Sequence, residues 1–121
     1  MTSGIYQLNF DNQAYYIGQS QDMETRWKQH ADKFLKGKAA AKMQEAYRYY
    51  GMPNARVLIH CHKDYLDTME NYYISIQKQF MGCLNTSAPA IDPNIDYQSL
   101  IDTPGILEHS SVEVLRHAIT L

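Results

Sequence analysis

An arginine and a histidine four residues apart, Arg26 and His30, are the first side chains in this sequence that could act together on a phosphate group. Residues at this spacing share one face of a helix, so the guanidinium and the imidazole would point in the same direction. The guanidinium binds phosphoryl oxygens at two points, and the imidazole can relay a proton. Each residue alone is ordinary, as a solvated helix arginine and as a hydrogen-bonded histidine beside the core. The pair therefore carries more information than its members.

Glu70 is a second candidate because it interrupts the apolar side of a predicted helix. Its neighbours at helical spacing are Leu66, Met69, Tyr73 and Ile74. An unpaired carboxylate near an apolar face costs on the order of several kcal/mol, so something must compensate for its charge. A basic side chain would do so, and so would a divalent cation bound through carboxylate oxygen and water. A third possibility is that the Glu70 carboxylate rotates to the edge of the apolar face, and the sequence leaves all three open.

Two tyrosines, Tyr6 and Tyr16, stand in tripeptides that are near mirror images, Gly-Ile-Tyr at 4–6 and Tyr-Ile-Gly at 16–18. In an antiparallel pair of strands both rings can lie on one face. Aromatic residues also pair across strands for packing alone, and this chain has ten tyrosines. We predict a shared face for the two phenols, which acquires chemical meaning only together with the other candidates.

His60 and His62, in the stretch VLIHCHKD, would point to one face of a strand. A metal site needs a third ligand that the sequence does not supply, so we expect none at this position. Cys61 and Cys83 lie far apart and outside any zinc-binding spacing, and we expect reduced, buried thiols.

The elements that position these residues follow from the hydrophobic pattern. Loose alternation predicts a hairpin with strands over residues 3–10 and 15–17. Asp22 is the predicted N-cap of a helix that runs to about Lys36. The predicted apolar stripe of this helix comprises Met23, Trp27, Phe34 and Leu35.

The remaining pattern predicts a helix over residues 38–50, a buried strand over 56–61 and a core helix over 64–80. Residues 88–105 are rich in Pro, Asp and Asn and predict an irregular connection. A short last helix is expected after Ser110 or Ser111, with the apolar residues Val112, Leu115 and Ile119.

Length and composition bound the class of protein. With 121 residues, of which 45% are hydrophobic and 20% charged, the chain fits one globular domain. No segment approaches the roughly 18 apolar residues of a membrane span, and no basic start precedes an apolar run. We therefore expect a cytoplasmic protein that does not contact membranes.

The net charge of −2 hides an uneven distribution. Between Arg26 and Arg48, seven basic residues stand against two acidic ones, a local balance of +5, so this stretch could face phosphates. The phosphate-facing lysines predicted here are Lys28, Lys33, Lys36, Lys38 and Lys42. After Leu84, five acidic residues stand against one arginine, a balance of −4. We expect this acidic segment to avoid phosphates or to compete with them for the basic stretch.

Taken in order along the chain, the candidate residues resemble the landmarks of the GIY-YIG nuclease superfamily. The landmarks are Gly4-Ile5-Tyr6, Tyr16-Ile17-Gly18, Arg26, His30, Glu70 and Asn85. Either tripeptide alone would be weak evidence, whereas the complete set in the family's order is specific. The resemblance runs from Ser3 to Ser87, about seven-tenths of the chain, and does not extend to the residues that follow.

The resemblance implies an α/β (α+β) fold, with a small three-stranded antiparallel sheet flanked by helices. Residues 1–87 would form the nuclease core, and residues 88–121 an acidic C-terminal extension whose short helix packs on the core or at a dimer interface. It also implies a DNA endonuclease that hydrolyses phosphodiester bonds with a single divalent cation, Mg²⁺ or Mn²⁺. The five lysines would then contact DNA.

By the same resemblance, the catalytic residues are Tyr6, Tyr16, Arg26, His30, Glu70 and Asn85. Glu70 would hold the metal, and Arg26 would clamp the phosphate. Tyr6 would take the proton of the attacking water, although a phenol with a pKa near 10 is a poor base at neutral pH. Its pKa must therefore fall, or Tyr6 must relay the proton to Tyr16 or His30. Asn85 would orient its neighbours.

Few residues remain outside the matched region, so we expect no separate DNA-reading domain in this sequence. Specificity would then come from DNA structure, a homodimer or a partner protein. The alternative is a catalytically weak DNA-binding or protein-interaction module that keeps the fold. The complete set of landmarks argues against that alternative, and the acidic segment argues mildly for it.

Overall fold

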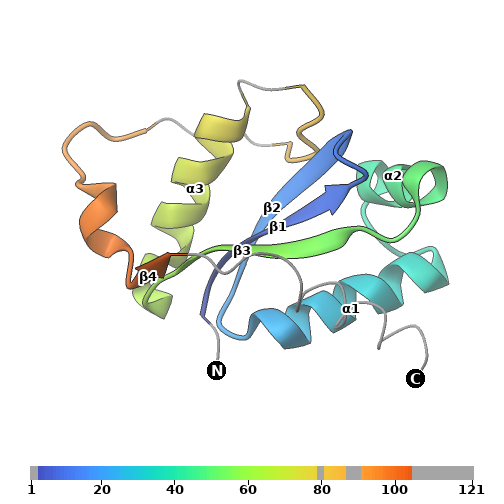
Figure 1. The fold of residues 1–121 in the computed structure, drawn as a ribbon, viewed down its shortest axis with the longest axis horizontal. Coiled ribbons are helices and arrows are strands. Elements are labelled where there is room, and N and C mark those ends of the chain that lie inside the picture. Colours follow the sequence, from blue (N-terminus) through green and yellow to red (C-terminus); the bar gives the residue numbers. More distant parts are fainter. Residues whose placement is uncertain (1–2, 79–80, 87–90, 105–121) are drawn as a thin grey trace.

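The computed structural model describes residues 3–78, 81–86 and 91–104. The predicted last helix, with Val112, Leu115 and Ile119, lies outside the described residues. Within them, an antiparallel sheet separates one helix from two others (Figure 1).

The sheet has the strand order β2-β1-β3-β4. The central strand β1 Gly4–Phe10 pairs with β2 Ala14–Ser20 on one side and with β3 Asn54–His60 on the other. The predicted hairpin and third strand are thereby confirmed. A fourth strand of two residues, β4 Thr103–Pro104, pairs with β3 in a stretch predicted to be irregular. That prediction is wrong there because so short a strand has no alternating pattern to reveal it.

Two helices follow the hairpin, α1 Met23–Lys36 and α2 Ala41–Tyr50, and α3 Leu66–Gln77 follows β3. Asp22 caps α1 as predicted, since its carboxylate accepts a hydrogen bond from the backbone N–H of Thr25 at 3.3 Å. The cap satisfies one of the N–H groups that the first helical turn leaves unpaired.

The helix boundaries differ from the predicted ones by a few residues. Gly37 ends α1 in the left-handed conformation, with φ of 71°, and the residues that turn the chain push the start of α2 to Ala41 instead of residue 38. The predicted start of the core helix at Asp64 falls in a separate 3₁₀ turn, η1 Lys63–Tyr65. The predicted end at Phe80 is also wrong, because α3 ends at Gln77 with Lys78 as its C-cap.

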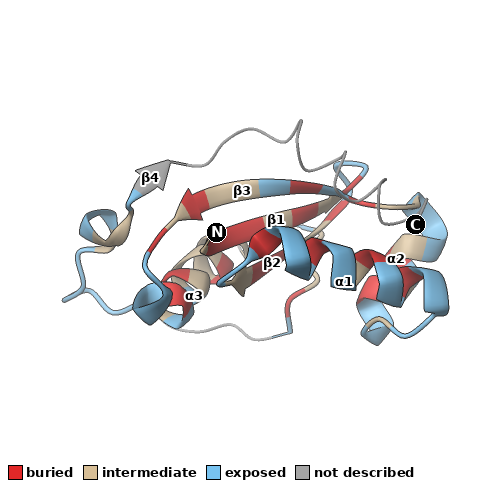
Figure 2. Ribbon diagram, turned by 90° about the horizontal axis from the view of Figure 1, so that it is seen from below, coloured by how far each residue is buried: buried red, intermediate tan, exposed pale blue. Residues whose placement is uncertain are grey.

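Buried residues form two clusters on opposite faces of the sheet. Neighbouring residues of β1, Ile5 and Tyr6, belong to different clusters because successive side chains of a strand point to opposite faces. The first cluster joins the sheet to α1 and α2 and comprises Tyr6, Leu8, Phe10, Ala14, Met23, Trp27, Ala31, Phe34, Met43, Ala46 and Ala55. The second joins it to α3 and comprises Ile5, Ile17, Ile59, Cys61, Leu66, Met69 and Ile74. In Figure 2 the central strand β1 is accordingly buried along most of its length.

The predicted apolar stripe of α1 is wrong at one position. Leu35 is 47% exposed, and Ala31 is fully buried in its place. Leu35 lies about 80° around the helix from Trp27, whereas Ala31 lies within about 40° of it. The buried side of α1 is therefore narrower than the hydrophobic pattern suggests.

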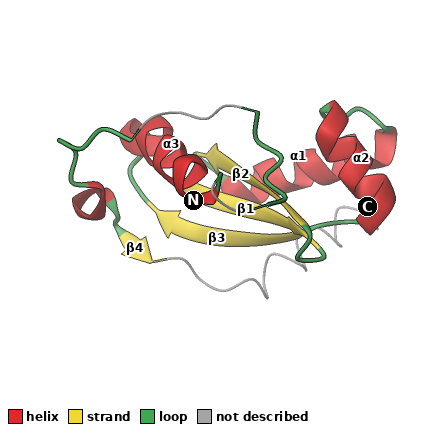
Figure 3. Cartoon of the chain, turned by 90° about the horizontal axis from the view of Figure 1, so that it is seen from above, coloured by secondary structure: helices red, strands yellow, loops and turns green. Residues whose placement is uncertain are grey.

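The described part of the acidic segment packs beside α3 and β3. The ring of Tyr97 stacks on Tyr72 with centroids 4.3 Å apart, and Leu100 and Ile101 pack against the second cluster. This segment contains the short 3₁₀ helix η2 Tyr97–Leu100 and leads into β4. It lies at the far end of the sheet from α1 and α2 (Figure 3). The boundary at residue 87 stays a prediction.

Two general features complete the fold. No helix among the described residues is both long and apolar enough to span a membrane. Cys61 and Cys83 are both free thiols. The prediction of a buried thiol is confirmed at Cys61 and wrong at Cys83, which is partly exposed.

Candidate active site

The two mirrored tripeptides are opposed across the β1–β2 pair. Tyr6 is the cross-strand partner of Gly18, and its ring lies where a side chain at position 18 would stand. A Cβ atom built on Gly18 would come within 2.5 Å of the Tyr6 ring and hydroxyl, far inside contact distance. Tyr6 can therefore occupy this position only because residue 18 is a glycine.

Both phenols lie on the α1 side of the sheet, as predicted. Tyr16 pairs with Leu8, two residues from Tyr6, so the two rings are diagonal neighbours on one face. His30 of α1 lies against both, with its ring centroid 5.9 Å from that of Tyr6 and 5.8 Å from that of Tyr16. A hydrogen bond of 2.7 Å joins the Tyr6 hydroxyl to His30 Nε2.

The surroundings of His30 keep its imidazole neutral. Burial, together with the positive charges of Arg26 and Lys33, lowers the pKa of His30 from its ordinary 6.5 to about 4. Burial also raises the pKa of the Tyr6 hydroxyl, and that of Tyr16. The two phenols therefore stay protonated at neutral pH.

Tyr6 and Tyr16 differ in their access to solvent. Tyr6 is 1% exposed, whereas Tyr16 is partly exposed. The fall in the Tyr6 pKa that a direct base would need is absent, because burial shifts this pKa upward. Of the two routes that the sequence left open for Tyr6, the hydrogen bond to His30 agrees with proton relay.

Tyr16 borders two adjoining cavities at the edge of the sheet. The first, of about 220 Å³, is lined by Tyr16, Arg26, His30, Lys33, Ala39, Ala40 and Met43. The second, of about 510 Å³, is lined by Tyr16, Ala40, Ala41, Lys42, Met43, Glu70, Ile74, Leu84, Asn85 and Thr86. Because three residues line both cavities, we treat them as one depression and call it the active-site groove.

Glu70 reaches this groove from the opposite face of the sheet. It belongs to α3, which packs on the second cluster, while Arg26 and His30 belong to α1. β2 is the edge strand, so side chains from both faces can meet beyond it. The groove thus combines residues that are about 40 positions apart in the sequence.

The Glu70 carboxylate is half-buried and has neutral hydrogen-bonding support. Gln19 of β2 donates from Nε2 to Glu70 Oε1 at 3.3 Å and to Asp67 Oδ1 at 2.6 Å. Burial raises the pKa of Glu70, the hydrogen bond from Gln19 opposes this shift, and the charge of Asp67 adds to it. No lysine or arginine among the described residues forms an ion pair with Glu70.

This environment fits a divalent cation held mainly by water. A half-buried carboxylate without a cationic partner offers a hard oxygen ligand, the type that Mg²⁺ and Mn²⁺ prefer. The described residues contain no group of three or more His, Cys, Asp or Glu side chains that could enclose a metal. Mg²⁺ commonly binds through one or two carboxylates together with waters and substrate phosphates, so a site built on Glu70 would need no second protein carboxylate.

Asn85 is buried, and its amide is fully engaged with β2. Its Oδ1 accepts from the backbone N–H of Ile17 at 2.9 Å, and its Nδ2 donates to the Ile17 carbonyl at 2.8 Å. The preceding residues run beside the same edge, where Leu84 N–H donates to the Tyr15 carbonyl. Asn85 therefore fixes the strand segment that carries Tyr16 and is a positioning residue.

A family model for the GIY-YIG catalytic domain matches residues 2–82 of this chain. The chain belongs to the GIY-YIG family. It is 35% identical to Intron-associated endonuclease 1 of Enterobacteria phage T4 over 79 residues, which make up 61% of this chain and 32% of that protein. The chain thus spans about a third of the length of this relative.

The fold is also similar to that of the catalytic domain of the homing endonuclease I-TevI. The TM-score is 0.61 at 29% sequence identity, and the match covers 70% of this chain and 98% of that domain. The predicted family and the predicted fold class are both confirmed by these matches.

Some of the lysines predicted to contact DNA lie beside the active-site groove of this GIY-YIG domain. Lys33 of α1 and Lys42 of α2 line it. Lys38 is exposed in the connection between the two helices.

Lys28 and Lys36 are not brought to the groove. Lys28 lies about 200° around α1 from Arg26, on the opposite side of the helix. Lys36 forms an exposed ion pair with Asp32 at 3.1 Å. A charge count along the sequence does not distinguish the two sides of a helix, so it predicts phosphate contact for all five lysines alike.

His60 and His62 lie apart from the groove, near the end of β3. They line a separate cavity of about 570 Å³ with Ser3, Gln21, Cys61, Lys63 and Asp102. His62 Nδ1 accepts from the backbone N–H of Asp64 at 3.1 Å, a contact within one turn. Among the described residues no third ligand completes a metal site there.

Gln19 is the site residue that sequence reasoning missed. It follows the last glycine of the second GIY-YIG tripeptide and faces α3, where it holds Glu70 and Asp67. A polar residue directly after an apolar strand segment was the available signal. The role of Gln19 depends on the packing of α3 against β2, which no local sequence pattern predicts.

Proposed function

We propose that this chain is a divalent-metal-dependent endonuclease that hydrolyses phosphodiester bonds in DNA. The observation that carries the proposal is the meeting of Arg26, His30 and Glu70 around one groove, from two helices on opposite faces of the sheet. Packing alone gives no reason for an arginine, a neutral histidine and an unpaired carboxylate to converge. The relatives named above, an endonuclease and a homing endonuclease domain, support the same reaction class.

Arg26 and Lys33 would bind the scissile phosphate. Both border the groove beside His30, and both charges act on the His30 ring. The guanidinium fork of Arg26 suits two phosphoryl oxygens and would stabilise the additional negative charge that develops in the transition state. Lys33 would add a single positive charge to the same group.

His30 would accept the proton of the attacking water. It is neutral at pH 7, and its Nε2 is hydrogen-bonded to the Tyr6 hydroxyl. In the tautomer that carries its hydrogen on Nδ1, the proton would reach Nε2 through Tyr6, which would take the proton of the water as it gives up its own. A pKa of about 4 makes His30 a weak base in the free protein. A bound phosphate would offset the charges of Arg26 and Lys33 and raise this pKa, so that basicity increases when the substrate is present.

Tyr6 and Tyr16 would orient the reacting groups. Tyr6, wedged over Gly18, fixes the His30 ring through its hydroxyl, and it can pass a proton to Nε2 without forming a free phenolate. Tyr16, which lines both parts of the groove, would donate a hydrogen bond to the phosphate or to the water. Both phenols act as protonated groups in this scheme.

Glu70 would hold the divalent cation, with its carboxylate oriented by Gln19. When bound, Mg²⁺ or Mn²⁺ supplies Lewis-acid stabilisation of the phosphoryl and leaving oxygens. Asn85 would keep β2 in register so that Tyr16 and Gly18 remain in place.

Incubation of supercoiled plasmid with the full chain in Mg²⁺, in Mn²⁺ and in EDTA tests the proposal. We expect nicked or linear product with either metal and none in EDTA. DNA binding without product in any metal would instead favour a binding module that keeps the fold. Parallel linear and branched DNAs would define the preferred substrate, and light scattering with and without DNA would detect a dimer.

A further inference from the structure

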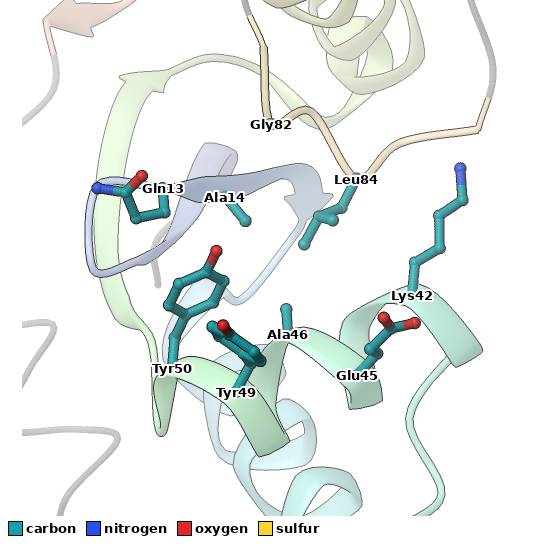
Figure 4. Close-up of a pocket in the computed structure, with 9 residues that line it drawn as sticks. All are labelled: Gln13, Ala14, Lys42, Glu45, Ala46, Tyr49, Tyr50, Gly82 and Leu84. Atoms are coloured by element: carbon teal, nitrogen blue, oxygen red, sulfur yellow. The ribbon is translucent and has the colours of Figure 1, made fainter.

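A further cavity adjoins the active-site groove and differs from it in its lining residues. It has a volume of about 490 Å³ and lies between the last turns of α2, the end of the hairpin and the segment before Asn85 (Figure 4). Its lining residues are Gln13, Ala14, Lys42, Glu45, Ala46, Tyr49, Tyr50, Gly82 and Leu84. Its size falls within the range of roughly 300–1,000 Å³ that is typical of small-ligand sites.

Two tyrosines at the end of α2 give this cavity an aromatic wall. Tyr49 is 82% exposed and Tyr50 is 38% exposed, with ring centroids 5.0 Å apart at 64°. Tyr47 of the same helix is used differently, since its ring stacks on Phe34 at the edge of the core. Of the three tyrosines in this turn, Tyr47 thus packs against the core, whereas Tyr49 and Tyr50 have exposed rings that a ligand could contact.

The aromatic wall is continuous with the groove. Lys42 and Leu84 line both this cavity and the part of the groove that contains Glu70. A polymer bound over the groove would therefore pass Lys42 and reach the two tyrosines. Figure 4 places Lys42 at the side of the cavity, with Tyr49 and Tyr50 at its base.

The polar groups in this cavity fit a nucleobase better than a phosphate. Lys42 can neutralise a phosphate at the rim of the cavity. Glu45 lies three residues further along α2, and its carboxylate would repel a phosphate placed inside the cavity. Glu45 and the tyrosine hydroxyls can accept hydrogen bonds from the amino group of a base. Aromatic faces, an acceptor for an amino group and a rim lysine together describe a site for a base attached to its backbone.

We propose that Tyr49 and Tyr50 stack an unpaired base of the bound DNA, which makes this cavity a specificity site for locally single-stranded DNA. A base within a duplex has both faces stacked and its edge paired, so it cannot offer a face to the two tyrosine rings. A base in a gap, bulge or frayed end can do so. This inference rests on the proposed function, because it takes DNA to be the polymer in the groove.

The test compares two DNAs of equal length, one fully paired and one with a short unpaired segment containing 2-aminopurine. Binding is measured with the full chain in EDTA, so that cleavage does not interfere. The variants are the doubly substituted Tyr49→Ala/Tyr50→Ala and Tyr49→Phe/Tyr50→Phe proteins. Tyr65→Ala serves as the matched control, since Tyr65 is 42% exposed and contacts His62 away from the groove.

We expect the double alanine variant to lose about tenfold or more in affinity for the unpaired DNA and less than about threefold for the duplex. The phenylalanine variant should retain most of the affinity, because stacking needs the ring and not the hydroxyl. Quenching of 2-aminopurine should accompany binding of the wild type and be lost in the alanine variant.

Equal losses on the two DNAs, or no loss with quenching intact in the alanine variant, would overturn the inference and leave the nuclease proposal standing. A wild-type protein that binds neither DNA would overturn both. Circular dichroism and melting curves of each variant exclude loss of fold. If the alanine variant is unstable, 2-aminopurine quenching by the wild type still tests the inference, because a wild type that binds the unpaired DNA without quenching would overturn it.

Discussion

His30 and His62 show how differently one residue type is used at the two ends of this domain. His30 is packed between two tyrosines of the sheet, and its hydrogen-bond partner lies 24 positions earlier in the chain. His62 is exposed, and its contacts with Asp64 span two positions. The first histidine therefore depends on the tertiary fold, whereas the second depends on its own turn.

This difference distinguishes a candidate functional site, around His30, from a local contact between His62 and Asp64. Around His30, residues from both faces of the sheet converge on one groove, and burial shifts the pKa of His30 far from its ordinary value. Near His62 the polar side chains line a cavity without a third metal ligand among the described residues. Convergence of distant residues with altered protonation, and not the presence of histidines, is the reason that we propose the His30 end as the functional one.

The largest effect is expected at the functional end from Arg26→Ala. Removal of the guanidinium takes away a charge at the phosphate, and loss of one such electrostatic group typically lowers the rate by about 10²–10³ or more. Lys28→Ala, on the opposite side of the same helix, should change the rate less than about twofold. Plasmid-nicking rates of the two variants, both checked by circular dichroism, measure the contrast, and similar rates would mean that the groove is misassigned.

Gly18→Ala should damage the fold and the site together. The added methyl group would meet the Tyr6 ring, and overpacking of this kind destabilises by about 1–3 kcal/mol. We expect a lower midpoint of urea unfolding and a shifted His30 ring signal in NMR spectra. Gly37→Ala is an instructive comparison, because its cost would come from the positive φ alone, with no atom near the new methyl group. An unchanged midpoint for Gly18→Ala would contradict the packing of Tyr6 over Gly18.

Deletion of residues 92–121 should destabilise the other end without changing DNA binding. It removes β4 and the Tyr97 ring that stacks on Tyr72, which we expect to lower the melting temperature by about 5–15 °C. The described acidic residues of this segment form no ion pair with α1 or α2. Binding isotherms at two salt concentrations check the second point. Tighter binding at low salt would instead indicate that the acidic segment competes with DNA.

Acidification should destabilise the protein through His30. The pKa of His30 is about 4 when folded and near 6.5 when unfolded, so between these values the unfolded chain binds a proton that the folded protein does not. Stability from this group is complete above pH 6.5 and is lost as the pH falls toward 4, by on the order of 1–2 kcal/mol for a partly exposed ring. His30→Gln should flatten this part of the stability curve, measured by urea unfolding. A slope unchanged by the substitution would contradict the neutral, half-buried state of His30.

The smallest effect is expected from His60→Ala and His62→Ala, which leave the groove intact. Each should nick plasmid within about twofold of the wild type in Mg²⁺. A loss above about tenfold in either folded variant would place part of the chemistry in the cavity lined by His60 and His62, and it would remove the contrast between the two ends.

Much of the fold followed from local signals. The hairpin, the Asp22 cap and the three main strands were predictable because alternation, capping and turn residues act over a few positions. The exposure of Leu35 and the two-residue strand β4 were not, since both depend on which surfaces pack together. The main candidate site residues could be identified because they occur in the same order along the chain as the landmarks of the GIY-YIG family.

The supporting residues of the site were harder to predict. Gln19 gained its role only because β2 lies beside α3, and the buried Asn85 proved to bond the Ile17 backbone through both ends of its amide. The raised pKa of Tyr6 likewise arises from burial under α1, which the sequence cannot quantify. The roles of residues that support the site, and the protonation states of its side chains, could thus be assigned only from the three-dimensional structure.

Single-turnover nicking by the Glu70→Gln protein is the most direct test of the central claim that this groove hydrolyses DNA with a divalent cation. The substitution keeps the shape and hydrogen bonding of the side chain and removes the charge that holds the cation. We predict metal-dependent nicking by the wild type and a rate at least about 10² lower for Glu70→Gln at saturating Mg²⁺, with unchanged melting temperature. A folded Glu70→Gln protein that nicks within about tenfold of the wild type would contradict the account.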